Sequence, residues 1–132
     1  MNESGFDVIT PEAWSWATGA HYAQAVRVGG LVLTCGVAPF DDTGALVGPN
    51  DFTMQCRQVV ANLTALLDAA GSSFDRIAQQ QVYLRREKDL DTFRQLRAGL
   101  YCPPYLASIM VVVTAHAHPE MLIEIACEAV AR

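Results

Sequence analysis

The sequence QCRQVVANLTALLDAAGSS at residues 55–73 decides the fold class. Its apolar side chains recur at steps of three and four residues, which is the spacing of one face of an α-helix. This face consists of Cys56, Val59, Val60, Leu63, Leu66, Leu67 and Ala70. Gly71 stands where a glycine commonly ends a helix. We therefore predict an amphipathic helix over about residues 52–70 that packs one face on a sheet.

Strand patterns lie on both sides of this helix. Residues 22–28 and 31–37 are typical of two strands joined at Gly29-Gly30, a dipeptide that accepts the backbone angles of a two-residue hairpin turn. After the helix, residues 77–84 are typical of a third strand, with glutamines in its middle. The chain up to residue 84 is thus predicted to run strand, strand, helix, strand.

The last third of the chain predicts one more helix and two closing strands. The helix covers about residues 90–101 and is stopped by the prolines that follow it. The strands cover residues 108–115 and 121–129, turned around His118 and Pro119. The order ββαβαββ predicts a single α+β domain over residues 1–132, with one mixed sheet that carries both helices on one face.

The last strand alternates between two kinds of side chain. Met121, Ile123, Ile125 and Cys127 fall on one face, and Leu122, Glu124, Ala126 and Glu128 fall on the other. Glu124 is therefore expected to point away from the main core. The sheet face that carries Leu122, Ala126 and Val130 needs a cover, and we expect another subunit to supply it.

The composition indicates an acidic, apolar-rich protein. Of 132 residues, 52% are hydrophobic and 17% charged, and association between copies would hide the excess of apolar surface. The net charge of −5 and the single lysine, Lys88, argue against nucleic-acid and anionic-membrane partners, because both need clustered cations. We expect further copies of the chain as its partners.

Cysteine and histidine spacing points to no cofactor. Cys35, Cys56, Cys102 and Cys127 are far apart among apolar neighbours, which is typical of reduced, packed thiols. The three histidines lack metal-ligand spacing, and we expect His116 to be a structural residue on a strand. With no signal-peptide pattern and no transmembrane run, the protein is expected in the cytoplasm, without metal or cofactor.

Four segments in order resemble the Rid family, whose members are RidA/YjgF-like proteins. They are YAQAV at 22–26 followed by LVLTCGVAP at 31–39, the helix with its AAGSS exit, VYL at 82–84, and HPEMLIEIACEAVA at 118–131. This resemblance covers most of the chain from about residue 22 to residue 130. It implies a chorismate-mutase-like α+β fold that forms a homotrimer, with ligand sites in the clefts between subunits.

The resemblance also implies roles for individual residues. Glu124 matches the carboxylate that orients or activates a water, Tyr22 the cleft tyrosine, and Gly36 the glycine whose backbone lines the pocket. Other interpretations remain open: Glu124 as a structural hydrogen-bonding group at an interface, Tyr22 as interface packing, and Gly36 as a requirement of strand-end geometry.

One departure from the family pattern concerns its substrate arginine. The family's imine deaminases carry an Arg after a Pro, which binds the substrate carboxylate, whereas this chain has PYLAS at 104–108 with no basic residue. Arg97 on the second helix is a candidate replacement, although a solvated surface arginine is the simpler interpretation. The residues expected to bind substrate are Gly36, Arg97, Leu106, Ser108 and Ile109.

Two functions fit these observations. The first is a hydrolase or deaminase-like enzyme that acts on C–N bonds of a small enamine or imine, with Glu124 and Tyr22 as catalytic residues. Without the arginine, we do not expect the standard deamination of 2-imino acids. The second is a non-catalytic trimer that binds a small molecule or stabilises a partner. Cys35 and Cys102 lack an identifiable histidine partner for nucleophilic catalysis.

Overall fold

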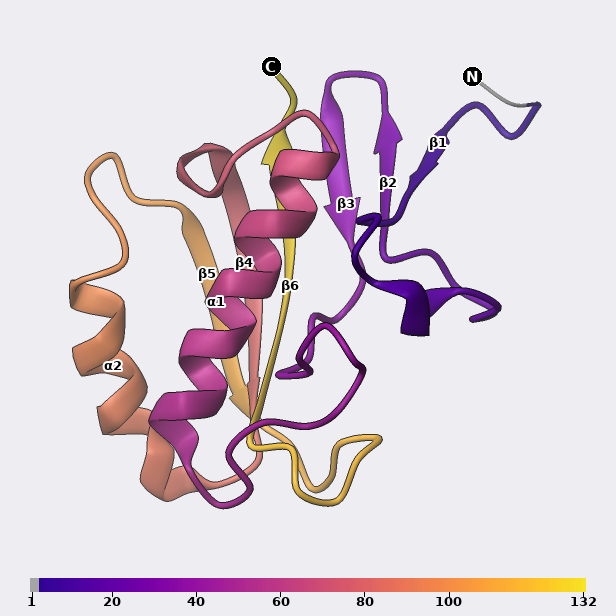
Figure 1. Ribbon diagram of the computed structural model, residues 1–132. Helices are drawn as coiled ribbons and strands as arrows, with labels where there is room; N and C mark the ends of the chain where they lie inside the picture. Colours follow the sequence, from indigo (N-terminus) through magenta and orange to yellow (C-terminus); the bar gives the residue numbers. More distant parts are fainter. Residues whose placement is uncertain (1–2) are drawn as a thin grey trace.

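The computed structural model describes residues 3–132 as one sheet covered on one face by two helices (Figure 1). The sheet has six strands in the order β1-β2-β3-β6-β4-β5. The elements are β1 (Asp7–Ile9), β2 (Ala25–Val28), β3 (Leu31–Thr34), α1 (Phe52–Ala69), β4 (Ile77–Leu84), α2 (Leu90–Ala98), β5 (Ala107–Val112) and β6 (Ile123–Val130), with short 3-10 turns at Ser15–Ala17, Phe74–Arg76 and Glu87–Asp89. The predicted mixed sheet with both helices on one face is confirmed.

Helix α1 begins and ends as its sequence predicts. The side chain of Asp51 accepts a hydrogen bond from the Met54 backbone nitrogen at 3.0 Å and so satisfies one free N–H of the first turn. Gly71 has a φ of 79° directly after the helix, a left-handed conformation that glycine adopts at little cost. The predicted apolar face lies against the sheet, except that Val60 is only half-buried.

The hairpin of β2 and β3 turns at Gly29-Gly30 as predicted. Val28 pairs with Leu31, and Gly29 has a φ of 56°, so the first glycine supplies the left-handed angle that the turn needs. Strand β3 ends at Thr34, earlier than expected, and Val37 forms only an isolated bridge with Ile125. The three-residue strand β1 beside β2 was not predicted, because it is too short to display an alternating pattern.

The two closing strands do not form the predicted neighbouring pair. Strand β5 pairs parallel with β4 at the sheet edge, while β6 lies antiparallel between β3 and β4. A parallel β4-α2-β5 unit requires a helical crossover, and α2 provides it. Residues 113–122 then carry the chain back to the sheet centre. His118 and Pro119 therefore lie in a long connection rather than a hairpin turn.

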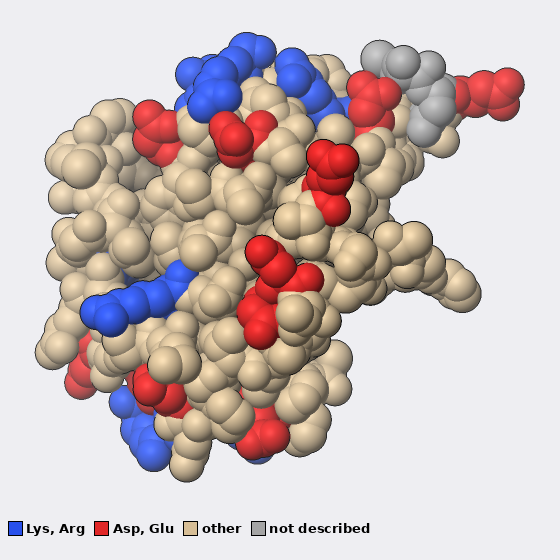
Figure 2. All heavy atoms as spheres, viewed as in Figure 1, with Lys and Arg blue, Asp and Glu red and all other residues tan. Residues whose placement is uncertain are grey.

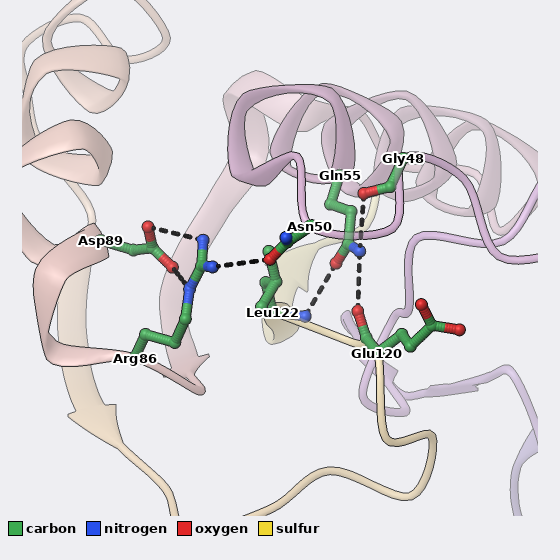
Figure 3. A network of polar contacts seen from close by, with 7 residues as sticks. All are labelled: Gly48, Asn50, Gln55, Arg86, Asp89, Glu120 and Leu122. Atoms are coloured by element: carbon green, nitrogen blue, oxygen red, sulfur yellow. Dashed lines mark hydrogen bonds and ion pairs between the residues drawn. The ribbon is translucent and has the colours of Figure 1, made fainter.

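A buried glutamine holds the end of that connection against α1 (Figure 3). The Gln55 side-chain amide donates hydrogen bonds to the backbone oxygens of Gly48 at 3.2 Å and Glu120 at 2.9 Å. Its oxygen accepts a hydrogen bond from the Leu122 nitrogen at 2.8 Å, and the residue is fully buried. Gln55 thus fixes where β6 begins.

The sheet face opposite the helices is open and largely apolar. Along β6, Ile123, Ile125, Cys127 and Ala129 are buried, while Glu124, Ala126 and Glu128 are half-buried on the open face, as predicted. Leu122 is an exception, since it precedes β6 and is buried in the core. Exposed side chains of the open face and its margins include Val28, Leu31, Ile109, Val111 and Val130.

Candidate functional site

Glu124 lies on the open sheet face, near the start of the interior strand β6. Strand β6 places it opposite Tyr83 of β4, and the bridge between Ile125 and Val37 brings the chain after β3 alongside it. The Glu124 side chain is 29% exposed, so its carboxylate is only partly hydrated. The sequence-predicted position of this residue, away from the core, agrees with the structure.

Gly36 leaves the space that the Glu124 carboxylate occupies. A Cβ atom at residue 36 would lie 1.6 Å from Oε1 of Glu124 and 2.5 Å from its Cδ, far inside van der Waals contact. The glycine thus allows the carboxylate to approach the backbone closely, and any side chain here would push the flexible end of Glu124 aside. The resemblance implies only that the Gly36 backbone lines the pocket.

His116 is the functional candidate that the sequence interpretation missed. It lies in the connection between β5 and β6, not on a strand, and its Nδ1 is 3.4 Å from Oε2 of Glu124. The imidazole is 97% buried, since only 3% of the side chain is exposed, and its Nε2 has no hydrogen-bond partner. A buried imidazole beside a carboxylate is suited to holding or moving a proton.

These groups border a hollow on the open face. The space available to a water-sized molecule is about 380 Å³, and the wall includes Gly36, Tyr83, His116 and Glu124. This volume falls in the range of small-ligand sites. The arrangement offers a partly exposed carboxylate to a bound molecule, with a buried imidazole 3.4 Å from that carboxylate. A carboxylate in such a place is suited to general acid and base catalysis.

Tyr22 lies outside this hollow. It is 62% exposed and lines a second, smaller hollow together with Trp14, Trp16 and Gln24. Gly36 borders both hollows. The two expected catalytic residues therefore line different hollows, which have Gly36 in common.

Three of the expected substrate-binding residues gather elsewhere, in a hollow between α2 and β5. Arg97, Leu106 and Ser108 line this space of about 380 Å³. The Arg97 guanidinium lies over the Phe93 ring, 5.9 Å from its centre, within the range of a cation–π contact. Ile109 lies on the open sheet face and is 48% exposed. A single chain does not bring these residues together with Glu124.

The cysteine thiols near the sheet are protonated at neutral pH. Burial, followed by the charge of Glu124, raises the pKa of Cys35 to about 11. Burial likewise raises the pKa of Cys56 to about 11 and of Cys127 to about 12. Cys102 is exposed, which departs from the expectation of packed thiols. A thiolate nucleophile at Cys35 is not supported, because the thiolate is the reactive form.

Metal ligands and membrane helices are absent from the described part of the chain. Within residues 3–132, no group of three histidine, cysteine or acidic side chains is placed to hold a metal ion. No helix in that range is long and apolar enough to cross a bilayer.

Fold and site together define a class: a small α+β domain whose open sheet face carries a carboxylate packed on a glycine of the neighbouring segment. A family model described as endoribonuclease L-PSP matches residues 14–131. The chain belongs to this family, as a Rid/YjgF-like protein. The resemblance noted in the sequence is thereby confirmed.

Individual relatives agree with this assignment. A RutC family protein of Pyrococcus horikoshii is 31% identical over 104 residues, 79% of this chain and 82% of that protein. The 3-aminoacrylate deaminase RutC of Acinetobacter baylyi is 28% identical over 107 residues, 81% of this chain and 84% of that protein. The 2-iminobutanoate/2-iminopropanoate deaminase of Salmonella typhimurium is 36% identical over 78 residues, 58% and 57% of the two chains.

A solved structure is similar over nearly the whole chain. RidA from an Antarctic Psychrobacter aligns with a TM-score of 0.84 at 28% identity, and the alignment covers 94% of this chain and 98% of that one. The strand order and the single-domain architecture are therefore those of a known fold.

Proposed function

We propose that this protein is an enzyme that hydrolyses or tautomerises a small imine or enamine in the hollow beside Glu124. The observation that carries the proposal is the placement of the Glu124 carboxylate 3.4 Å from the buried imidazole of His116, at the edge of a space for a small molecule. The deaminases among the relatives support the reaction class.

In this proposal Glu124 takes a proton from a bound water while the water oxygen attacks the imine carbon. The proton passes to the substrate nitrogen and gives a carbinolamine. Its hydroxyl proton then moves through Glu124 to the same nitrogen, so that the C–N bond breaks and ammonia leaves as the carbonyl product forms. His116 is proposed to hold the carboxylate in position and to share the proton during transfer. No cofactor is needed for these steps.

The substrate is proposed to differ from those of the deaminase relatives. Both relatives are named for substrates that carry a carboxylate. The position expected for a carboxylate-binding arginine is Leu106 here, and Arg97 in the same hollow lies over the Phe93 ring, 5.9 Å from its centre. We therefore propose an uncharged imine or enamine as the substrate.

We further propose that the protein works as a homotrimer in the cytoplasm, with the open sheet face covered by neighbouring copies. The exposed apolar side chains of this face support a subunit interface. Such an interface would let residues of the α2–β5 hollow from one copy approach Glu124 of another. It would complete a site that a single chain holds in pieces.

A nuclease function is not proposed, despite the description of the family. On the face drawn in Figure 2, basic side chains form small separate groups with acidic side chains near them, and no continuous basic surface appears. The net charge of −5 also opposes binding of a polyanion.

The test compares Glu124→Gln with Glu128→Gln. Both glutamates are half-buried on the same face of β6, but Glu128 accepts a hydrogen bond from Gln81 at 3.0 Å and lies outside the proposed hollow. Imines are generated in situ from amines by an amine oxidase and from amino acids by an amino-acid oxidase, and semicarbazide traps what remains.

We expect the unmodified chain and Glu128→Gln to remove at least one imine faster than buffer does. Glu124→Gln is expected to lose this activity by a factor of at least about 100, since an amide cannot take the proton. Equal rates for Glu124→Gln and the unmodified chain would reject the enzymatic proposal in favour of a binding protein.

A further inference from the structure

Two buried N–H donors line the smaller hollow and have no hydrogen-bond partner. They are Nε1 of Trp16 and Nε2 of Gln24, and the Gln24 residue is only 4% exposed. Native proteins pair nearly all buried hydrogen-bond donors, so two unpaired donors in one cavity indicate a site for an acceptor. We propose that this hollow is a binding site for a single neutral carbonyl oxygen of a ligand.

The Cys35 thiol lies beside the oxygen end of the Gln24 amide. The Cys35 sulfur is 3.5 Å from Oε1 of Gln24 and also 3.5 Å from the Gly36 backbone oxygen, so its proton can be donated to either acceptor. Because burial raises the pKa of Cys35 to about 11, the thiol keeps its proton at neutral pH and can donate it. The amide oxygen thus has a donor within reach, whereas the N–H₂ end has no hydrogen-bond partner among the described residues and is left for an occupant of the hollow.

The remaining amide in the wall cannot serve as the missing acceptor. Asn62 donates to the backbone oxygens of Ala38 at 3.0 Å and Phe40 at 2.8 Å, and its own oxygen accepts a hydrogen bond from Gln58 at 2.9 Å. Its hydrogen bonds support the loop after β3. The acceptor for Trp16 and Gln24 must therefore come from outside this set of residues.

The size and charge of the hollow limit what the acceptor can be. The space open to a water-sized molecule is about 20 Å³, which suits one oxygen atom or one water. Among the described residues, no cation lines the hollow, and the Glu124 carboxylate packs against Gly36 on its border. An anionic oxygen would be buried beside a negative charge without compensation, so a ketone, aldehyde or amide oxygen is favoured.

The position of the hollow links it to the reaction proposed above. Gly36 borders both hollows, and Tyr22 lines this one from an exposed position. A carbonyl held by Trp16 and Gln24 would anchor a ligand without the family's arginine. Identifying this ligand as the substrate rests on the proposed function, whereas binding of the carbonyl does not.

Tryptophan signals give a direct measurement, because Trp14 and Trp16 are the two tryptophans of the chain and stack with ring centres 5.6 Å apart. The probes are acetamide and acetate, which are similar in size and differ in charge. We expect acetamide to shift the Trp16 indole N–H resonance saturably, with a dissociation constant in about the millimolar range for so small a ligand. Acetate is expected to leave it unchanged.

Variants then assign the signal to the two donors. Gln24→Met removes one donor at similar volume and should weaken acetamide binding by about fivefold or more. Gln95→Met, at an exposed position of α2, is the matched control and should bind as the unmodified chain does. If Gln24→Met fails to fold, Trp16→Phe, followed through the fluorescence of Trp14, must show the same weakening.

Glu124→Gln separates this inference from the proposed function. This variant should retain acetamide binding even when turnover is lost. Absence of catalysis therefore does not contradict the proposed carbonyl-binding site. The inference is overturned if acetamide gives no saturable shift, if acetate binds equally well, or if Gln24→Met binds acetamide undiminished. It is also overturned if crystals soaked with acetamide hold only a water between Trp16 and Gln24.

Discussion

Restoring an arginine at residue 106 should convert this chain into a better deaminase of carboxylated imines. Leu106 is half-buried beside a hollow of about 380 Å³, which has room for a guanidinium. Of the arginines already there, Arg94 pairs with Asp91 at 2.9 Å, and Arg97 lies over the Phe93 ring, 5.9 Å from its centre. Neither stands at the position after Pro104 where the family's deaminases carry their arginine.

The expected gain follows from the bond that Leu106→Arg would add. Hydrogen bonds to a charged group contribute about 1.5–3 kcal/mol, which corresponds to roughly tenfold to a few hundredfold in productive binding. The assay generates 2-iminobutanoate with an amino-acid oxidase and measures its survival by semicarbazide trapping. Leu106→Lys is the matched control, because an ammonium lacks the two-pronged geometry and should gain less.

Two results would contradict this reasoning. If the unmodified chain already works at the rate of an arginine-bearing relative, another group must bind the carboxylate, and Arg97→Ala is the next variant to measure. If Leu106→Arg folds with an unchanged melting temperature and association state yet gains nothing, residue 106 does not reach the site that contains Glu124.

Three further predictions follow from the geometry. Gly36→Ala should force the Glu124 carboxylate to move by more than about 1 Å and lower turnover in the imine assay about 100-fold. Its melting temperature should change little, because residue 36 does not need a left-handed backbone angle, and an unchanged rate would show that the carboxylate position is unimportant. Burial raises the thiol pKa of Cys56 to about 11 and of Cys127 to about 12 from 9.0, so the protonated thiols stabilise the fold below pH 9. This stabilisation is lost as pH rises through 11–12, and a flat melting temperature across that range would contradict it. Light scattering should give a particle mass three times the chain mass of 14.3 kDa, and Val111→Glu on the open face should reduce the particle to a single chain. A monomeric unmodified chain would refute the trimer.

Local patterns in the sequence predict most elements of this fold. Three features follow from patterns among residues that are close together in the sequence. They are the helix over residues 52–69, the glycine hairpin and the alternation along β6. The position of β6 between β3 and β4 depends instead on which edges remain unpaired after α2 has crossed over. That is a property of the assembled sheet. The expectation that the two closing strands, adjacent in the sequence, are also neighbours in the sheet is therefore wrong.

The candidate site was predictable only where a residue matched a family pattern. Glu124 and Gly36 were both selected in that way, but their direct contact follows from the pairing of β6 with the segment after β3. His116 gives no periodic signal, because a loop that Gln55 helps to anchor sets its position. A histidine that precedes the strand glutamate by eight residues is the one clue the sequence offers.

The central place of β6 has a consequence for how the molecule is made. Strands β1, β2 and β3 form one half of the sheet and β4 and β5 the other, and only β6 joins them. During synthesis both halves emerge before residues 123–130 exist, so each must wait with an unpaired edge that is open to aggregation. Because Glu124 lies on the joining strand, the chain acquires its site in the same event that closes the sheet.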